Sequence, residues 1–420
     1  MAVANGYGKV VTSGSVFMYD TSDTINSYMG EPTTNLINPN APNIYSWWSR
    51  STQTITQLSE TYKGNPIYRV SISIDDGDML YHINARWGAG SGWYMPSTTY
   101  YANTSYVASV IYRPVSHADT RVYGHPSNIS GWGLTVDDSI DLDGGWKQHR
   151  IDRNYGTTVG DNRFHHMHTP SATIGQTVII DITSSQIEAK AHATPFVNGA
   201  RSATQGLLPV IGNSAIDLTN VSFDSNAQMV FDGTNDYVNL GSYLHNINTS
   251  ILSIELVFKT NVVTGNSKIL LGWHENEYPH GYICLGNFTG HWGNESISFY
   301  NEGPGTTPLS FAYTNGHSFL SDMLYHHVVF ILKTNEYKIY IDGTEVAVNA
   351  SFRNGTQSTV MPSNLFGYGA TPSVILGAGS DPAGAFFDGV IPVTKIYNRA
   401  LSAAEVQQNY SKYKSRFNLS

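Results

Sequence analysis

Two glutamates separated by one residue are the first candidates for acid–base chemistry in this sequence. Glu275 and Glu277 lie in the stretch Trp-His-Glu-Asn-Glu at positions 273–277. On a β-strand such residues share a face about 6.6 Å apart, which is near the carboxylate separation that glycoside hydrolysis requires. However, asparagine stands between them where a further acid is typical, and a Tyr-Pro pair follows at once. We therefore expect a solvated loop or a polar contact to a partner, no catalytic residue and no enzymatic activity.

Two groups of aspartates offer the oxygen ligands that calcium prefers. Both lie among glycines, in stretches typical of loops, where aspartate is also favoured simply as a turn residue. The sequence therefore allows structural calcium, or plain acidic turns, and it suggests no other cofactor. The candidate ligands are Asp75, Asp76, Asp78, Asp141 and Asp143.

A run of histidines gives a second, weaker metal candidate. On a strand, His166 and His168 would share a face and could bind zinc, or a metal on the axis of a trimer. No Asp, Glu or Cys at ligand spacing completes a site beside them. We expect an ordinary surface strand here.

Aromatic residues in polar, glycine-rich stretches are the best indication of ligand binding. Sugars stack on exposed rings and form hydrogen bonds with neighbouring polar groups. The alternative is that these rings belong to the core or to a subunit interface. The candidate glycan-binding residues are Trp47, Trp48, Trp87, Trp93, Tyr94 and Trp132 in the first half, and Trp273, Asn287 and Trp292 in the second.

Composition narrows the classes of partner. The chain has 23 Lys+Arg against 32 Asp+Glu and no dense basic run, so nucleic acid and anionic membranes are not expected partners. The single cysteine, Cys284, excludes an intrachain disulfide and a cysteine-based zinc site. No apolar run is long enough to span a bilayer, and the first residues lack the apolar core of a signal peptide. We expect synthesis in a cytoplasm without a signal peptide.

Turn residues and alternating apolar residues predict an all-β protein. Charged residues make up only 13%, while Gly (39) and Tyr (27) are abundant, which favours short strands joined by turns. Residues 1–37 are predicted to be an arm that drapes over a neighbouring surface or attaches to a larger assembly. Residues 38–200 are predicted to form a jelly-roll sandwich, and residues 201–218 a linker punctuated by Gly and Pro. The strands expected in this sandwich are 67–74, 99–112, 146–152 and 177–182.

A second sandwich is predicted over residues 219–420. Its first strand lies in Met229–Gly241, where alternating apolar residues flank Asp-Gly-Thr-Asn-Asp and indicate a strand, a tight turn and a second short strand. Ser402 with Glu405 three residues later is a capping box, which predicts a C-terminal helix. The other strands expected are 253–259, 325–332, 336–341 before an Asp-Gly turn, and 389–398.

Several phrases in the first domain resemble the closing strands of a carbohydrate-binding jelly roll, although no obvious ligand platform accompanies them. The phrase with Thr194 also resembles a form frequent in virion proteins of tailed bacteriophages, and Gly30–Asn35 is similar to a phrase near the start of such proteins. The phrases are Gly145-Trp146-Lys147, Val178-Ile179-Ile180-Asp181-Ile182 and Gln186-Ile187-Glu188 followed by Ala193-Thr194-Pro195-Phe196.

The second domain contains the phrases Phe231-Asp232-Gly233, Asp236-Tyr237-Val238, His326-His327-Val328, Tyr340-Ile341-Asp342-Gly343, and Phe387-Asp388-Gly389 through Ile396 to Ser402. With these phrases it resembles the laminin-G-like, concanavalin A-like lectin/glucanase sandwiches. This resemblance implies two curved antiparallel sheets and, commonly, recognition of glycans or proteins. Asp232 and Asp388 are then turn-forming residues.

Together these resemblances imply a non-enzymatic structural or adhesion protein on the surface of a phage virion, in a tail fibre, collar or head decoration. The expected partners are other virion proteins through the N-terminal arm, further copies of the chain in a homo-oligomer, with a trimer favoured, and host-surface glycans bound weakly. The main alternative is an extracellular glycan-degrading enzyme or its carbohydrate-binding accessory module. A third possibility is an architectural subunit without a ligand.

Overall fold

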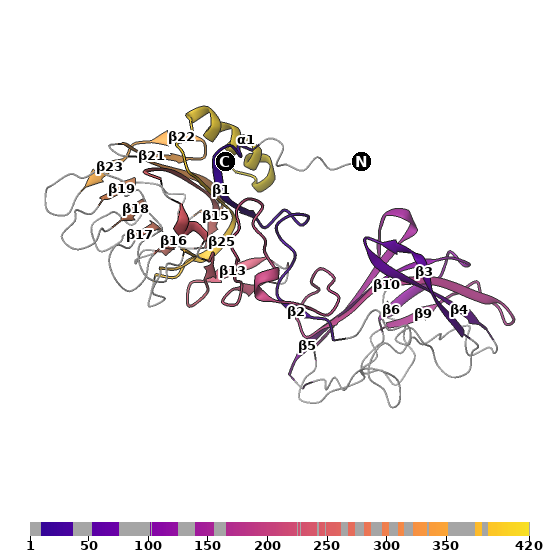
Figure 1. Cartoon of the computed structure of the whole chain (residues 1–420). Helices are drawn as coiled ribbons and strands as arrows, with labels where there is room; N and C mark the ends of the chain where they lie inside the picture. Colours follow the sequence, from indigo (N-terminus) through magenta and orange to yellow (C-terminus); the bar gives the residue numbers. More distant parts are fainter. Residues whose placement is uncertain are drawn as a thin grey trace. The chain divides into compact units, whose positions relative to one another are not determined.

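The structure is a computed structural model of the 420-residue chain. It divides into two compact units: unit 1 comprises Met1–Pro32 and Ser202–Ser420, and unit 2 comprises Thr33–Arg201 (Figure 1). Unit 2 is thus an insertion between two parts of unit 1. The residues described are 10–36, 53–74, 101, 103–124, 139–154, 165–224, 226, 228–241, 243–247, 249–261, 268–273, 281–286, 296–301, 310–314, 322–333, 336–351, 374–379 and 385–419.

Unit 1 contains two antiparallel sheets, and the all-β prediction is confirmed. The first sheet has eight strands in the order β12-β13-β25-β15-β20-β21-β22, with β1 also paired to β25. These strands are β1 (Ser15–Asp20), β12 (Ser222–Phe223), β13 (Met229–Asp232), β15 (Ile251–Thr260), β20 (Tyr325–Lys333), β21 (Glu336–Ile341), β22 (Thr344–Val346) and β25 (Asp388–Tyr397).

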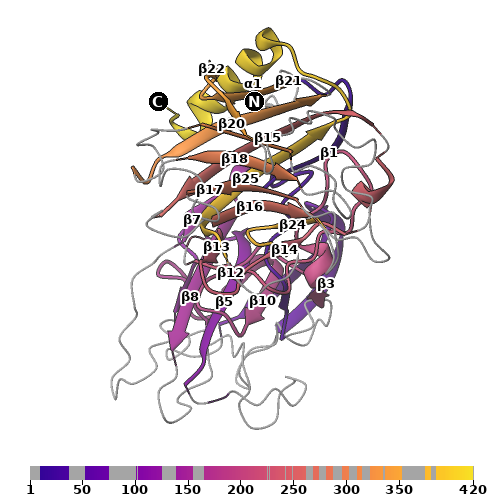
Figure 2. The same ribbon diagram turned by 90° about the vertical axis from the view of Figure 1, so that its left-hand side faces the viewer.

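The second sheet of unit 1 has seven strands in the order β14-β24-β16-β17-β18-β19-β23 (Figure 2). Alternate residues of the two sheets form one buried core, with Phe231, Leu256 and Phe330 from the first sheet and Leu285 and Phe299 from the second. The strands of this sheet are β14 (Val238–Asn239), β16 (Lys268–Trp273), β17 (Gly281–Leu285), β18 (Ile297–Asn301), β19 (Ser310–Thr314), β23 (Asn349–Ser351) and β24 (Val374–Leu376).

Residues 10–32 of the N-terminal segment are packed into this sandwich and do not form a separate arm, and residues 33–36 belong to unit 2. β1 pairs with β25 from Ser15 opposite Tyr397 to Asp20 opposite Val393. Phe17 and Tyr19 are fully buried. An arm available to other virion proteins would need these side chains to be accessible.

The predicted linker also belongs to unit 1. Leu207, Ile216 and Leu218 are fully or almost fully buried in the core between the sheets. A 3-10 turn (Ala203–Gln205) lies near the start of this segment. Another 3-10 turn (Tyr243–Asn246) lies outside it, after β14. Residues 202–218 are therefore a packed part of unit 1 and not a connection between the two units.

The stretch Met229–Gly241 contains two strands as predicted, but it does not form a hairpin. β13 pairs with β25 in the eight-stranded sheet, with Phe231 opposite Gly389. β14 pairs with β24 in the other sheet, with Val238 opposite Leu376. The turn between them therefore carries the chain from one sheet to the other. It is not the start of the sandwich either, because β1 and β12 precede it.

Helix α1 (Ala403–Phe417) begins where the capping box predicts. The Ser402 side chain accepts a hydrogen bond from the Glu405 amide, and the Glu405 carboxylate accepts one from the Ser402 amide. The helix covers the outer face of the eight-stranded sheet, where Tyr410 and Tyr413 pack against His327 of β20 (Figure 1). Within the described ranges, no helix combines the length and the apolar character needed to cross a bilayer.

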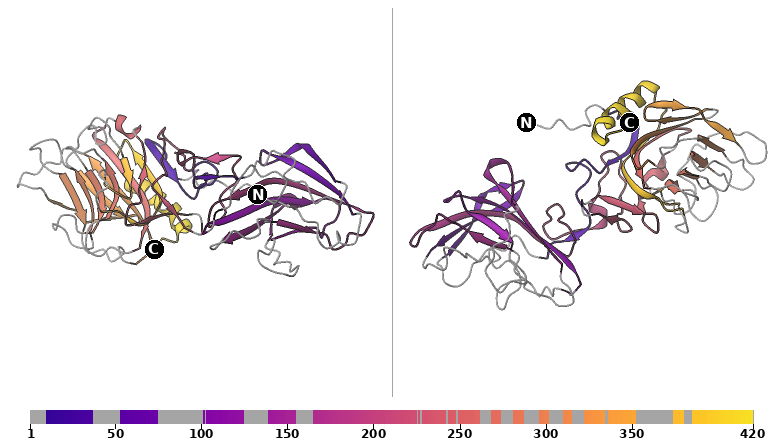
Figure 3. Two further views of the ribbon diagram at one scale, coloured as in Figure 1. Left: turned by 90° about the horizontal axis from the view of Figure 1, so that it is seen from below. Right: turned by 180° about the vertical axis from the view of Figure 1, so that it is seen from behind.

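Unit 2 has a six-stranded antiparallel sheet in the order β3-β4-β10-β5-β8-β7 and a two-stranded sheet of β6 and β9 (Figure 3). One face of the larger sheet is apolar and includes Val70, Ile72, Val110 and Ile180. The strands are β3 (Gln53–Tyr62), β4 (Asn65–Ser73), β5 (Ser105–Pro114), β6 (Arg121–Gly124), β7 (Ile140–Asp141), β8 (Lys147–Asn154), β9 (His165–His168) and β10 (Thr177–Glu188).

The two ends of unit 2 are tied together at its base. Thr33 and Thr34 form β2, which pairs with β11 (Ala200–Arg201). The buried Glu188 carboxylate accepts hydrogen bonds from the hydroxyls of Thr33 (2.6 Å) and Thr194 (2.5 Å). The Asn35 side chain bonds to Ser185, Ile187 and Val197 backbone atoms. The two phrases that resemble virion proteins thus meet in one polar cluster.

Candidate functional site

Most of the residues predicted from the sequence to bind a ligand lie outside the described residues. The described candidates are Trp273, Asp141 and Asp143, together with the backbone of His165–His168, which pairs with β6. The side chains of these histidines are not among those described. Outside lie Trp47, Trp48, Trp87, Trp93, Tyr94, Trp132, Asn287 and Trp292, the aspartates Asp75, Asp76 and Asp78, and the glutamates Glu275 and Glu277.

Trp273 is a core residue, so its prediction as a glycan-stacking platform is wrong. It ends β16 and is only 2% exposed. Its ring stacks on Phe299 of the same sheet, with centroids 5.7 Å apart. A sugar cannot reach this ring without opening the sandwich, because the side chain is almost fully buried.

Among the described residues, Asp141 and Asp143 are not joined by a third candidate calcium ligand. Asp141 forms an ion pair with Lys147 of the neighbouring strand, so a protein cation already occupies its carboxylate. Asp143 begins a 3-10 turn (Asp143–Gly145) and has an exposed side chain. Among the residues described, no group of three or more His, Cys, Asp or Glu side chains is placed to hold a metal. The plain acidic turn explains this pair.

Two arginines surround one buried aspartate on the six-stranded sheet of unit 2. They lie on the face opposite the apolar one, and we call this the open face. Asp181 of β10 lies opposite Arg69 of β4 and Arg113 of β5. Arg69 donates to Asp181 through Nε (2.7 Å) and Nη2 (3.0 Å). Arg113 donates through Nη2 (2.7 Å) and Nε (3.3 Å). Asp181 is fully buried, whereas the side chains of Arg69 and Arg113 remain 37% and 29% exposed.

The electrostatics of this cluster keep all three groups charged. Burial alone would raise the pKa of Asp181, but the hydrogen bonds and charges of the two guanidinium groups outweigh it and hold that pKa below its usual value. The hydrogen bond to Asp181 raises the pKa of Arg69 further. Two cations and one anion leave a net positive charge on the open face. Glu60, 3.9 Å from Arg113, is 71% exposed and offsets this charge only weakly.

An aromatic pair supports one side of the arginine cluster. The Arg113 guanidinium lies over the Trp146 ring, 4.7 Å from its centroid. Tyr62 packs on the same ring at 4.7 Å. Trp146 is 5% exposed, so it braces the arginine and does not itself offer a stacking surface. On the Arg69 side of the cluster, Thr56 of β3 is in register with Arg69 of β4, and Thr54 is in register with Ser71.

We refer to Arg69, Arg113, Asp181, Trp146 and Tyr62 as the arginine cluster. It presents fixed, charge-assisted hydrogen-bond donors beside hydroxyl groups, an arrangement suited to a polar ligand with anionic or hydroxyl oxygens. Part of this cluster has a signal in the sequence, because Trp146 and Asp181 lie in the phrases that resemble carbohydrate-binding jelly rolls. The arginines were missed because only the strand register brings them to Asp181.

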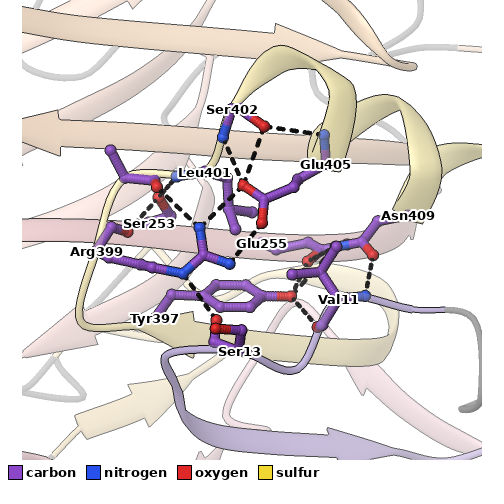
Figure 4. A network of polar contacts seen from close by, with 11 residues as sticks. Val11, Ser13, Ser253, Glu255, Tyr397, Arg399, Leu401, Ser402, Glu405 and Asn409 are labelled. Carbon is purple, nitrogen blue, oxygen red and sulfur yellow. Dashed lines mark hydrogen bonds and ion pairs between the residues drawn. The ribbon is translucent and has the colours of Figure 1, made fainter.

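A second polar cluster lies between the eight-stranded sheet and α1 of unit 1 (Figure 4). Its centre is Glu255 of β15, which is fully buried. The carboxylate accepts hydrogen bonds from His327 Nε2 (2.9 Å), Tyr397 Oη (2.8 Å) and Asn409 Nδ2 (2.8 Å). The buried Lys395 Nζ lies 3.6 Å from the same group. Burial would raise the pKa of Glu255, but these partners outweigh burial and hold it at about 2.

This cluster joins the N-terminal segment to the helix. Val11 N donates to Asn409 Oδ1 (2.7 Å), and the Tyr397 hydroxyl lies 3.0 Å from the Val11 carbonyl oxygen. Nearby, Arg399 bonds to the Ser13 carbonyl oxygen and to the Glu405 carboxylate (Figure 4). Because its central groups are shut off from solvent, the Glu255 cluster stabilises the fold and does not offer a ligand site.

Comparison with known families finds a match within unit 1. Residues 232–407 match Laminin_G_3, the concanavalin A-like lectin/glucanases superfamily. The predicted laminin-G-like domain is supported, and the described strands of this region build its two sheets. A search of curated proteins found no match.

Comparison with solved structures found similar β-domains. Domain 4 of AbnA, an extracellular arabinanase from Geobacillus stearothermophilus in complex with arabinotriose, is 18% identical with a TM-score of 0.31, covering 48% of this chain and 83% of that chain. The CBM40 of the Ruminococcus gnavus IT-sialidase is 13% identical with a TM-score of 0.30, covering 42% and 90%. The botulinum neurotoxin serotype D binding domain is 12% identical with a TM-score of 0.36, covering 51% and 50%. The chain spans 26% of the sialidase NanB.

Proposed function

We propose that this chain is a non-enzymatic, lectin-like protein that binds glycans through the open face of the six-stranded sheet in unit 2. The observation that carries the proposal is the arginine cluster, in which Asp181 fixes the guanidinium groups of two partly exposed arginines on a sheet face beside threonine and serine hydroxyls. Such donors match the oxygens of sugars. The concanavalin A-like match of residues 232–407 supports a lectin-like assignment for that part of unit 1.

The test is a glycan array probed with the full chain, displayed in many copies on beads so that weak sites add up. We expect binding to a subset of glycans, and loss of that binding when Arg113 is replaced by glutamine. The matched control is Arg150→Gln, because Arg150 belongs to the same sheet, is half-exposed and pairs only loosely with Asp152 at 3.6 Å. An array without hits at high valency would contradict glycan binding.

We also propose that the protein acts at the surface of a tailed-phage virion, in a tail fibre, collar or head decoration, and that it forms a homo-oligomer, with a trimer favoured. This proposal rests on the resemblance of Gly30–Asn35 and of the Gln186–Phe196 region to virion proteins. Repeated copies on a particle would strengthen weak glycan sites. Mass spectrometry of purified particles should find the chain, and light scattering should give its copy number; its absence from particles would contradict the virion location.

The absence of enzymatic activity is proposed on the sequence around Glu275 and Glu277, where no third acid completes a catalytic pattern. Incubation with polysaccharides should release no reducing ends. Release that disappears in Glu275→Gln would instead establish a glycan-degrading enzyme.

A further inference from the structure

Resting on the proposed glycan binding, we propose that the ligand of the arginine cluster is an acidic glycan whose sugar carboxylate binds between the guanidinium groups of Arg69 and Arg113. The two groups are held on one carboxylate of the protein, on a sheet face, with part of each side chain exposed. Three properties of the cluster indicate the class of ligand: the arginine N–H groups that Asp181 does not bind, the net positive charge, and the fixed positions of the guanidinium groups.

Asp181 does not use all the donors of the arginines. It takes Nε and Nη2 of Arg69 and the same two atoms of Arg113. A guanidinium carries five N–H groups, so the Nη1 groups of both residues are not engaged by Asp181. A second carboxylate placed over the pair could accept from both arginines. Planar donors of this kind match carboxylate geometry better than they match a single hydroxyl.

The local charge favours an anion although the chain as a whole is acidic. The formal net charge is −9, whereas the arginine cluster has two cations around one anion. Lys63, whose ammonium lies 5.5 Å from the Tyr62 ring centroid, adds a further cation, and the exposed Glu60, 3.9 Å from Arg113, offsets the positive charge only weakly. A neutral sugar would leave this positive charge uncompensated in the complex. A sugar carboxylate would neutralise it, and its hydrogen bonds from the guanidinium groups would join two opposite charges instead of one charge and a neutral hydroxyl.

The cluster is already ordered before a ligand arrives. Four hydrogen bonds to the buried Asp181 fix both guanidinium planes, and the Trp146 ring supports Arg113 from one side. Binding therefore loses little side-chain entropy, which is the main penalty for long arginine side chains. The hydroxyls of Thr54, Thr56 and Ser71 continue along the same face and suit the remaining sugar hydroxyls.

The experiment measures binding of the full chain to matched pairs of neutral and carboxylated sugars by titration calorimetry. The pairs are lactose with 3′-sialyllactose, and the methyl ester of trigalacturonate with trigalacturonate. We expect one or both carboxylated members to bind at least about tenfold more tightly than its neutral partner, since charge-assisted bonds are each stronger than neutral ones. Raising NaCl from 50 to 300 mM should weaken the acidic ligand severalfold and leave the neutral one unchanged.

Variants locate the site. Arg69→Gln should weaken the acidic ligand about tenfold to a hundredfold, while Arg150→Gln should leave it unchanged. Arg69→Lys keeps the charge but loses the planar donors, and should fall between wild type and Arg69→Gln. Circular dichroism confirms folding, and the salt dependence of the wild type tests the inference even if a variant unfolds.

The outcomes separate the two proposals. If neutral and carboxylated sugars bind equally and Arg69→Gln has no effect on either, glycan binding stands and the acidic-sugar inference is overturned. If no glycan binds the wild-type chain in the array or in calorimetry, the proposed function itself fails. Preference for the carboxylated member, lost in Arg69→Gln but kept in Arg150→Gln, supports both.

Discussion

Replacing Glu255 by glutamine should destabilise unit 1 severely, although the change keeps the shape of the side chain. Glu255 is the buried anion that faces Lys395 at 3.6 Å, and it accepts three further hydrogen bonds. Glutamine would leave Lys395 as a buried cation without its counter-charge and would turn an amide N–H₂ toward groups that donate. Breaking a buried pair in this way typically costs about 3–5 kcal/mol.

The control is a second substitution that removes the stranded cation. Lys395→Met alone leaves the Glu255 carboxylate with its three hydrogen-bond donors, so it should cost less than Glu255→Gln. The double variant Glu255→Gln, Lys395→Met should recover at least about 2 kcal/mol of the loss, because no unpaired charge remains.

The pH dependence gives an independent check on the same residue. The folded pKa of about 2 lies below the ordinary value of 4.5, so the carboxylate contributes stability that is fully present above pH 4.5 and is lost as the pH falls toward 2. The difference corresponds to about 3 kcal/mol. Glu255→Gln should abolish this part of the acid destabilisation.

The measurement is scanning calorimetry, in which the two units are expected to unfold in separate transitions. Only the transition of unit 1 should shift, and that of unit 2 serves as the internal reference. The reasoning is refuted if Glu255→Gln lowers the stability of unit 1 by less than about 0.5 kcal/mol, or if the double variant is no more stable than Glu255→Gln.

Three further outcomes are expected. Trp273→Ala should lower the free energy of unfolding of unit 1 by about 3–5 kcal/mol, measured by calorimetry, because it removes a buried ring; loss of glycan binding at unchanged stability would restore Trp273 as a ligand residue. Ser402→Ala should cost about 1 kcal/mol by removing the helix cap, with Ser411→Ala as an exposed control in the same helix; equal effects of the two would argue against the cap. Gly389→Ala should cost at least about 2 kcal/mol, because its φ is +145° and a Cβ would meet the Lys259 carbonyl oxygen at 2.0 Å; a stable variant would show that the backbone adjusts there.

The strands of unit 1 could be predicted where alternating apolar residues in the sequence match the side chains that are buried in the structure. β15, β20 and β25 lie within a residue or two of their expected positions, and the capping box located the start of α1. The hairpin of β21 and β22 turns at Asp342 and Gly343, both with positive φ, as an Asp-Gly pair predicts. These features depend on neighbours in the sequence.

The features that were not predicted depend on residues that are far apart in the sequence. β1 is short, and nothing near it indicates that its partner is β25, almost at the other end. The same holds for Asp181, whose arginine partners come from two other strands. The histidines of β20 looked like part of a strand with apolar faces, yet His327 is a buried member of the Glu255 cluster. Aromatic content predicted Trp273 as a binding residue, but a ring of that size is often recruited to the core instead.

Because Thr33 pairs with Arg201, unit 2 is an inserted domain whose two ends are adjacent, so it can be removed without disturbing the chain path of unit 1. The chain leaves the host sandwich at Pro32 and returns at Ser202, and the first residues beyond these points are neighbours across one antiparallel ladder. Such neighbours have Cα atoms only about 5 Å apart. A two-residue turn can therefore bridge the gap left by the whole insertion. Unit 2 can also be exchanged for another domain with adjacent ends, in evolution or by design, while β1 stays paired with β25.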